Sequence, residues 1–134
     1  MTMALGETLT SSYRITRDDL RDYAVASGDH NPIHLDPQAA MDANLPDTIA
    51  HGMLVMGLAL SSVGGTGIVR ECKARWSRPV VVPAEGTEIT VDATVTAVTN
   101  EGTRLRITAF CGGEQTMTMS RVVVSNDPVG EEIP

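Results

Sequence analysis

The second half of this sequence alternates apolar and polar residues, and this alternation limits the fold more than any other feature of the chain. A period of two is the pattern of a β-strand with one buried face. The alternation runs through residues 71–77, 88–97, 104–109 and 116–120. Asn100-Glu101-Gly102 and Gly112-Gly113 separate the last three segments as short turns, which predict antiparallel hairpins. The sequence therefore predicts an antiparallel sheet with one apolar face.

One apolar segment in the first half can cover this sheet. From His51 to Val63 almost every residue is apolar, and a helix that is apolar on all sides is typical of a buried position. Gly57 is unfavourable within a helix, so with the small residues Ala59 and Ser61 it indicates close approach by another backbone. We therefore expect an α+β fold in which an antiparallel β-sheet is wrapped around one central buried helix.

Two other helices are predicted before this segment. A capping-box pattern that begins at Thr16 predicts an amphipathic helix from Arg17 to Ala26, which ends at Gly28. A shorter helix is predicted from Pro37 to Met41, because proline favours the first helical position. The rest of the first half reads as loops, and we predict no strand there.

Composition excludes several classes of protein. The 134 residues fit one domain, residues 1–134, and 10 Lys+Arg against 17 Asp+Glu give a net charge of −7. An acidic chain with few aromatic residues lacks the surface that binds nucleic acid. No apolar run approaches the ~20 residues that span a membrane, and the N-terminus does not resemble a signal peptide. Cys72 and Cys111 have no metal-ligand or disulfide spacing, so we expect a cytoplasmic protein.

The candidate chemistry lies on the loop between the first two predicted helices. Asp29 and His34 share this loop, which Pro32 stiffens. A carboxylate and an imidazole on one fixed loop are the groups that proton transfer needs. Each residue also has a structural alternative, in which Asp29 and Asn31 form Asx-turns and His34 is a satisfied core histidine. Their combination favours a chemical role.

Two segments resemble a known family. Ser27-Gly28-Asp29-His30-Asn31-Pro32-Ile33-His34, followed by Ala50-His51-Gly52-Met53-Leu54, resembles the MaoC-like (R)-specific enoyl hydratases and 3-hydroxyacyl-thioester dehydratases. The second segment is also similar to the small dehydratase subunits of mycobacterial type II fatty-acid synthesis. The resemblance implies a hot-dog fold, which agrees with the sheet and helix predicted above.

The resemblance also implies catalytic roles. Asp29 and His34 would flank a water, or the 3-hydroxyl of the substrate, and move protons between oxygen and C2. The N–H of Gly52, at the start of the apolar helix, would polarise the thioester carbonyl with the help of the helix dipole. We leave open which of Asp29 and His34 transfers which proton.

The candidate substrate-binding residues are Asn31, His51 and Met53. For Asn31 we favour fixing the loop over touching the substrate, and for His51 we favour orienting the loop. The sequence departs from some CoA-active members at Leu60, where those proteins carry a serine that is thought to hold the catalytic Asp.

Seven of the ten basic residues fall in the second half: Arg70, Lys73, Arg75, Arg78, Arg104, Arg106 and Arg121. On neighbouring strands they could bind the phosphates of CoA or of a phosphopantetheine arm, or an acidic acyl carrier protein. The alternative is a solvated sheet face with cross-strand pairs to Glu71, Glu88 and Asp92.

We therefore predict a hydro-lyase that interconverts (3R)-hydroxyacyl and trans-2-enoyl thioesters of CoA or an acyl carrier protein, with no metal and no organic cofactor. A hot-dog thioesterase ranks lower, because it needs a carboxylate on the central helix and residues 53–63 contain none. A non-catalytic acyl-binding or scaffold subunit is the alternative from another class. A homodimer is expected, because an open sheet edge tends to be paired; a heterodimer with a second hot-dog subunit is the alternative.

Overall fold

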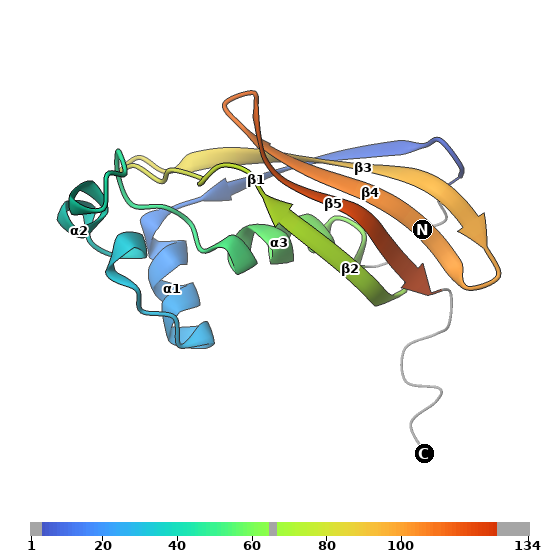
Figure 1. The fold of residues 1–134 in the computed structure, drawn as a ribbon, viewed down its shortest axis with the longest axis horizontal. Coiled ribbons are helices and arrows are strands. Elements are labelled where there is room, and N and C mark those ends of the chain that lie inside the picture. Colours follow the sequence, from blue (N-terminus) through green and yellow to red (C-terminus); the bar gives the residue numbers. More distant parts are fainter. Residues whose placement is uncertain (1–3, 65–66, 126–134) are drawn as a thin grey trace, which may run out of the picture.

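The computed structural model describes residues 4–64 and 67–125 (Figure 1). The strands are β1 (Thr8–Ile15), β2 (Ile68–Trp76), β3 (Thr87–Thr99), β4 (Gly102–Cys111) and β5 (Glu114–Ser125). The helices are α1 (Arg17–Ser27), α2 (Pro37–Asp42) and α3 (Gly52–Ser61), with a 3-10 turn at Pro32–His34. No helix in these described ranges is long and apolar enough to cross a membrane.

The strands form one antiparallel sheet in the order β1-β3-β4-β5-β2. The two predicted hairpins are present, since Thr99 pairs with Gly102 and Cys111 pairs with Glu114. The long hairpins therefore form the centre of the sheet, while β1 and β2 lie at its two edges. The predicted sheet and the hot-dog fold are confirmed.

The strand β1 corrects the expectation that the first half contains no strand. It pairs with β3 along its whole length. It buries Ile15, and Leu9 and Tyr13 pack against the core. Ser11 and Ser12 interrupt its apolar alternation, and an edge strand needs only part of one face to be apolar. Periodicity alone therefore gave too weak a signal to predict it.

The core lies between the inner face of the sheet and one side of α3 (Figure 1). Its largest fully buried side chains on β3, β4 and β5 are Ile89, Val91, Val95, Leu105, Ile107, Met117 and Met119. From α3, Val55 and Ala59 join this cluster. The alternation read from the sequence thus places its apolar members on the face that meets the helix.

The helix α3 is shorter and less enclosed than predicted. It covers Gly52–Ser61 instead of residues 51–63, and only its side toward the sheet is buried. Met53 is 58% exposed, and no atom lies within 4 Å of a Cβ built on Gly57. The prediction of burial on all sides, and of a backbone packed against Gly57, is therefore wrong for the single chain, because one curved sheet covers only one side of a helix.

The caps of α1 direct the chain into the candidate loop. The Thr16 hydroxyl accepts from the N–H of Asp19, and the Asp19 carboxylate accepts from the N–H of Thr16, so the predicted capping box is present. Gly28 ends the helix with φ at 79°, as predicted. The helix extends one residue further than predicted, to Ser27, and α2 likewise extends to Asp42.

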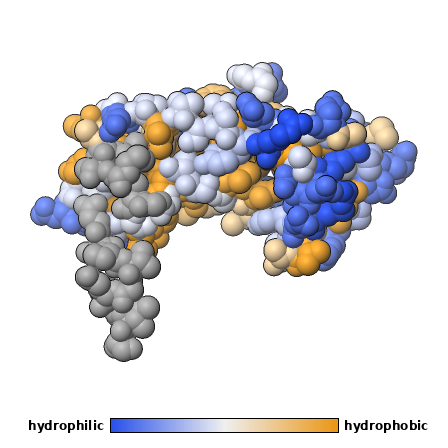
Figure 2. Space-filling model, turned by 180° about the vertical axis from the view of Figure 1, so that it is seen from behind, coloured by the Kyte–Doolittle hydropathy of each residue, from blue (hydrophilic) through white to orange (hydrophobic). Residues whose placement is uncertain are grey.

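Hydrophilic side chains are unevenly distributed over the surface. The view from behind shows strongly hydrophilic side chains gathered at the end of the molecule that carries α1 and α2 (Figure 2). Acidic residues at this end include Asp18, Asp19, Asp22, Asp36 and Asp42. The other end is formed by the far part of the sheet (Figure 1).

Gly102 begins β4 in a backbone conformation that a side chain would disturb. Its φ is 139°, and a Cβ there would lie 2.1 Å from the carbonyl oxygen of Val124. We expect Gly102→Ala to lower the free energy of unfolding by about 2 kcal/mol or more through strain and steric overlap. Urea unfolding measures this change.

The matched control is Gly113→Ala, because Gly113 also has a positive φ but no atom within 4 Å of the added Cβ. It should cost only about 1 kcal/mol. Equal effects of the two substitutions would contradict the predicted overlap at Gly102.

Candidate active site

The loop after α1 is fixed by short side chains that bond to its own backbone. The Ser27 hydroxyl accepts from the N–H of Asp29, 3.1 Å away. Asp29 Oδ1 accepts from the N–H of Asn31 at 3.1 Å, and Asn31 Oδ1 accepts from the N–H of Ile33 at 3.3 Å. Asp29 thus spends one carboxylate oxygen on the turn and keeps Oδ2 free of it. Asn31 caps the 3-10 turn, as the loop-fixing role requires.

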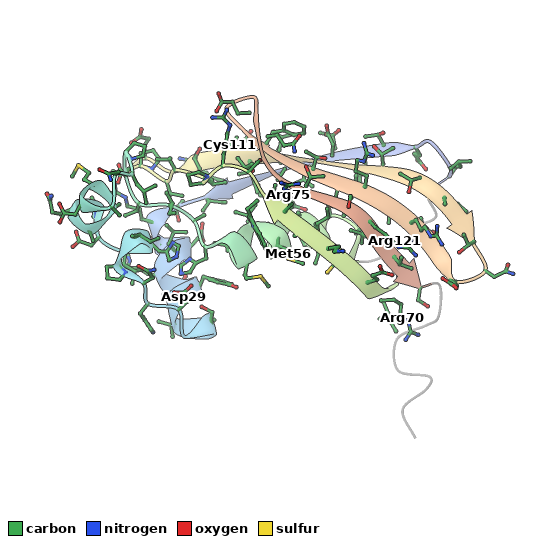
Figure 3. All side chains as sticks on the ribbon, viewed as in Figure 1. Asp29, Met56, Arg70, Arg75, Cys111 and Arg121 are labelled. Atoms are coloured by element: carbon green, nitrogen blue, oxygen red, sulfur yellow. The ribbon has the colours of Figure 1, made fainter. Side chains whose placement is uncertain are left out.

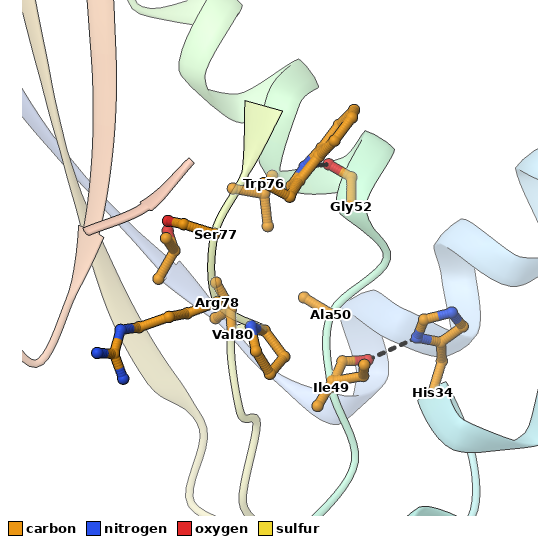
Figure 4. Close-up of a pocket in the computed structure, with 11 residues that line it drawn as sticks. His34, Ile49, Ala50, Gly52, Trp76, Ser77, Arg78 and Val80 are labelled. Atoms are coloured by element: carbon orange, nitrogen blue, oxygen red, sulfur yellow. Dashed lines mark hydrogen bonds between the residues drawn. The ribbon is translucent and has the colours of Figure 1, made fainter. Parts of the chain in front are cut away.

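His34 is buried at the end of this turn, with one ring nitrogen committed. Its Nδ1 lies 2.7 Å from the carbonyl oxygen of Ile49 (Figure 4). A carbonyl only accepts hydrogen bonds, so Nδ1 carries the proton and the neutral ring has its lone pair on Nε2. This Nε2 faces Asp29 Oδ2 at 3.9 Å. The gap is too long for a direct hydrogen bond, and a substrate oxygen beside it can lie within hydrogen-bond distance of both groups.

His51 connects the loop to the start of α3. Its ring stacks on that of His34, with the centroids 3.8 Å apart and the planes inclined by 22°. Its Nε2–H donates to the backbone carbonyl of Asp29 at 3.1 Å, and Tyr23 lies edge-on to the ring. His51 therefore holds both Asp29 and His34 in place. Within the described residues its buried Nδ1 has no hydrogen-bond partner.

The buried environment keeps His51 neutral. Burial lowers the pKa of His51 below its ordinary value of 6.5; the hydrogen bond to the Asp29 carbonyl opposes this shift and the neighbouring His34 ring adds to it. A neutral ring still donates from Nε2, so the contact with Asp29 does not depend on a charge.

Gly52 is the first residue of α3, so its N–H has no acceptor within the helix. The positive end of the helix dipole adds to the local potential there. The Trp76 indole N–H donates to the Gly52 carbonyl at 3.0 Å, and a Cβ on Gly52 would lie 3.0 Å from the indole nitrogen. The absence of a side chain at this position thus allows the ring of Trp76 to pack directly on the backbone.

Two cavities border this point. One, of about 300 Å³, is lined by His34 and by apolar residues that include Ala50, Val55 and Val80 (Figure 4). The other, of about 390 Å³, is lined by Asp29, His51, Met53, Tyr23 and Ser27. Gly52 and Trp76 line both. His34 thus lines one cavity and Asp29 the other, and Gly52 lies beside both.

The structure brings most of the predicted site residues together, but not all of them. Asp29, His34, His51 and Gly52 come together. Met53 lines a cavity beside Asp29, with most of its side chain exposed. The side-chain oxygen of Asn31 is used by the loop.

The structure also shows what surrounds Leu60, where some CoA-active members carry a serine. Leu60 packs against the core. Ser61 and Ser62 donate to backbone carbonyls of α3 itself, at Leu58 and Ala59. The main chain of Asp29 is held instead by Ser27 and His51.

Trp76 was not among the predicted site residues. The sequence places it in an alternating strand, where a tryptophan reads as part of a sheet face. Two features could have pointed to Trp76 as a site residue: it is the only tryptophan of the chain, and it stands at the end of that strand.

Of the seven basic residues of the second half, only Arg78 lines one of the two cavities, the one that also contains His34. Arg70, Arg75 and Arg121 lie along β2 and β5, apart from Asp29 (Figure 3). Arg121 pairs with Glu71 at 3.3 Å, and Arg78 pairs with Glu114 at 3.2 Å. Asp92 accepts from Thr10. The cross-strand pairing predicted for a solvated face is thus present at Glu71.

Asp29, His34 and His51 also form the kind of group that could bind a metal ion, since one ligand atom of each lies within 4.8 Å of the others. The two imidazole rings are stacked face to face. Their in-plane lone pairs therefore lie side by side and do not converge on one point, as tetrahedral coordination requires. The geometry suits proton transfer better than metal binding.

The antiparallel sheet packed on α3 defines a hot-dog domain, and its loop presents a carboxylate and an imidazole beside the N-terminus of that helix. The chain belongs to the MaoC-like domain family, whose model matches residues 3–129. The predicted family is thereby confirmed.

Individual relatives agree with this assignment. The chain is 41% identical over 73 residues to 3-hydroxyacyl-thioester dehydratase X of Mycobacterium tuberculosis, a match that covers 53% of this chain and 26% of that protein. The chain thus spans about a quarter of the length of this relative. Among solved structures, a MaoC-like dehydratase has a TM-score of 0.87 at 32% identity, covering 93% of this chain and 41% of the other.

An (R)-hydratase from A. caviae, described as involved in PHA biosynthesis, superimposes with a TM-score of 0.81 at 28% identity and covers 92% of this chain and 98% of its own. Solved proteins of the same fold also include two named as complexes, ChsH1-ChsH2 and HadBC of Mycobacterium tuberculosis. At 16% and 17% identity these two show the fold alone.

The lowered pKa of His51 predicts a pH dependence of stability. The unfolded chain binds a proton at this residue more readily than the folded chain does, because burial favours the neutral ring. His51 therefore contributes stability above pH 6.5 that is lost as the pH falls below 6.5. Urea unfolding of the parent and of His51→Phe, at about pH 7.5 and about pH 5.5, should show the larger loss in the parent.

The control is His30→Ala, because His30 is exposed on the same loop. This variant should lose as much stability on acidification as the parent. A His51→Phe protein that also matches the parent would show that the buried ring does not couple folding to protonation.

Proposed function

We propose that the protein is a hydro-lyase that interconverts (3R)-hydroxyacyl and trans-2-enoyl thioesters. The observation that carries this proposal is the pair formed by Asp29 Oδ2 and His34 Nε2, which face each other at 3.9 Å beside the first N–H of α3. Removal or addition of water needs two proton-transfer groups on one side of the substrate and a donor at the carbonyl. These residues provide all three.

In the hydration direction, one member of the pair takes a proton from water as the oxygen attacks C3. Electron density moves to the thioester carbonyl, where the N–H of Gly52 and the helix dipole stabilise the enolate. The other member holds the one proton that the pair carries before the reaction and delivers it to C2 on the same face, and the proton taken from water restores the pair. In dehydration the two groups exchange roles. No step requires a metal ion or an organic cofactor.

The two cavities beside Gly52 suit a thioester whose carbonyl sits at this residue. The carbonyl carbon has two substituents, the acyl chain and the sulfur with its pantetheine arm, and each can extend into one cavity. The largely apolar cavity with Val55 and Val80 suits the acyl chain. Thioesters of CoA and of an acyl carrier protein share the pantetheine arm, so both are candidate substrates. The names of the dehydratase and hydratase relatives support this substrate class.

The geometry favours this activity over the two alternatives. A hot-dog thioesterase needs a carboxylate on the central helix, and Gly52–Ser61 contains none. A non-catalytic subunit does not require two histidines and a carboxylate that the loop and α3 hold in a fixed arrangement.

We propose further that the chain forms one domain over residues 1–134 and assembles as a homodimer in the cytoplasm. The unpaired side of β2 is an open sheet edge. The exposed apolar side chains Met53 and Trp76 lie at the same cavity. A partner would cover both. Because the candidate catalytic residues are all in this chain, a second kind of subunit is not required; a heterodimer is the alternative. Cys72 and Cys111 are free thiols, as a reducing compartment allows.

Substitution of either proton-transfer residue tests the proposed activity. Asp29→Asn and His34→Ala should each lower kcat for a crotonyl thioester by about two to four orders of magnitude, the range typical of a positioned acid or base. The absorbance of the enoyl thioester follows the reaction.

The exposed neighbour His30, changed to alanine, is the control and should keep parental activity. Circular dichroism checks that each variant is folded. Parental rates in both folded site variants would refute the assignment of Asp29 and His34.

Assembly is tested by light scattering on the chain expressed alone. A homodimer has about twice the 14.2 kDa mass of one chain. A stable and fully active monomer would contradict the proposed assembly. An inactive lone chain that recovers activity with a co-expressed second hot-dog subunit would show a heterodimer instead.

A further inference from the structure

Trp76 lies at the candidate active site but has no role in the proposed reaction. It ends the edge strand β2, and its indole N–H donates to the Gly52 carbonyl at 3.0 Å. Three ring atoms lie 3.0 to 3.5 Å from the place where a Gly52 Cβ would be. The nitrogen edge of the ring therefore packs on the first residue of α3, and the hydrogen bond holds it there.

The same residue borders both cavities. Trp76 and Gly52 are the residues that line both of them. If the thioester carbonyl binds at the N–H of Gly52, the atoms one bond away from the carbonyl carbon lie nearest to these two residues. These atoms are C2 of the acyl chain and the sulfur. C2 must also stay within reach of Asp29 and His34, so it cannot move away from the indole.

We propose that Trp76 makes the site selective for acyl groups that are unbranched at C2. This inference rests on the proposed function, because it uses the carbonyl position at Gly52. A methyl group on C2 needs space that the indole occupies. The ring cannot swing away without losing its hydrogen bond to the Gly52 carbonyl. A straight chain carries only hydrogens on C2 and fits beside the ring.

Two isomeric saturated thioesters test this selectivity without any reaction. Butyryl and isobutyryl pantetheine have the same atoms and differ in branching at C2. Calorimetric titration of the parent should show tighter binding of the butyryl compound by about tenfold or more, the usual effect of one misplaced methyl group. Because Trp76 is the only tryptophan of the chain, its fluorescence should also change when the butyryl compound binds.

Removal of the ring should remove the preference. In Trp76→Ala the butyryl-to-isobutyryl affinity ratio should fall to within about threefold, mainly because the branched compound binds better. Trp76→Leu is a second truncation in case the alanine variant does not fold. Trp76→Phe keeps a ring and should keep most of the preference. Light scattering on each variant checks that assembly is unchanged.

Phe110→Ala is the matched control, because Phe110 is an aromatic residue of β4 that lines neither cavity. It should keep the parental ratio. Equal affinities of the parent for the two isomers, or an unchanged ratio in folded Trp76→Ala and Trp76→Leu, would overturn the inference.

Turnover separates this inference from the proposed function. The parent should hydrate crotonyl pantetheine with a higher kcat/KM than 2-methylcrotonyl pantetheine, and Trp76→Ala should narrow the difference. A parent that hydrates neither compound would refute the proposed function, and the binding ratio of the saturated isomers would still decide the role of Trp76. Normal hydration with no discrimination would refute the inference alone.

Discussion

The candidate site depends on the packing of His51 against the loop after α1. One ring nitrogen donates to the Asp29 carbonyl, and the ring face supports His34 at a centroid distance of 3.8 Å. His51 also precedes the first residue of α3. One side chain thus joins the carboxylate, the imidazole and the helix N-terminus. Since burial favours the uncharged form of this ring, it can hold the loop without placing a positive charge beside His34.

The fold brings these groups together because α3 lies along the inner face of a continuous antiparallel sheet. Apolar packing of Val55 and Ala59 against the sheet fixes the helix axis, which in turn fixes the direction of the Gly52 N–H. The end of β2 adds Trp76, whose indole N–H donates to the carbonyl of the same residue, Gly52. The reacting position is therefore bounded by two rigid elements and by one loop with its own internal hydrogen bonds. This preorganisation is what acid–base and oxyanion stabilisation require.

The sequence predicted those features that depend on nearby residues. Glycine turns and alternation revealed the hairpins β3-β4 and β4-β5, and the spacing of Asp29 and His34 around Pro32 revealed the loop. Contacts between distant segments were not predictable in this way. Trp76 meets Gly52 across 24 residues, and only the docking of β2 onto the sheet brings them together. The sequence analysis did not predict that one side of α3 is exposed. A run of apolar residues shows that a helix surface must be covered, but it does not show whether the same chain or another chain covers it.

The central claim is that Asp29 and His34 add water across the double bond of an enoyl thioester on one face. Proton NMR of crotonyl pantetheine incubated with the protein in D₂O tests this claim most directly. The account predicts (3R)-3-hydroxybutyryl pantetheine with one deuterium at C2, placed syn to the new hydroxyl, and with the thioester intact. Release of free pantetheine and crotonate would contradict the account and indicate a thioesterase, and an unchanged crotonyl thioester would contradict catalysis altogether.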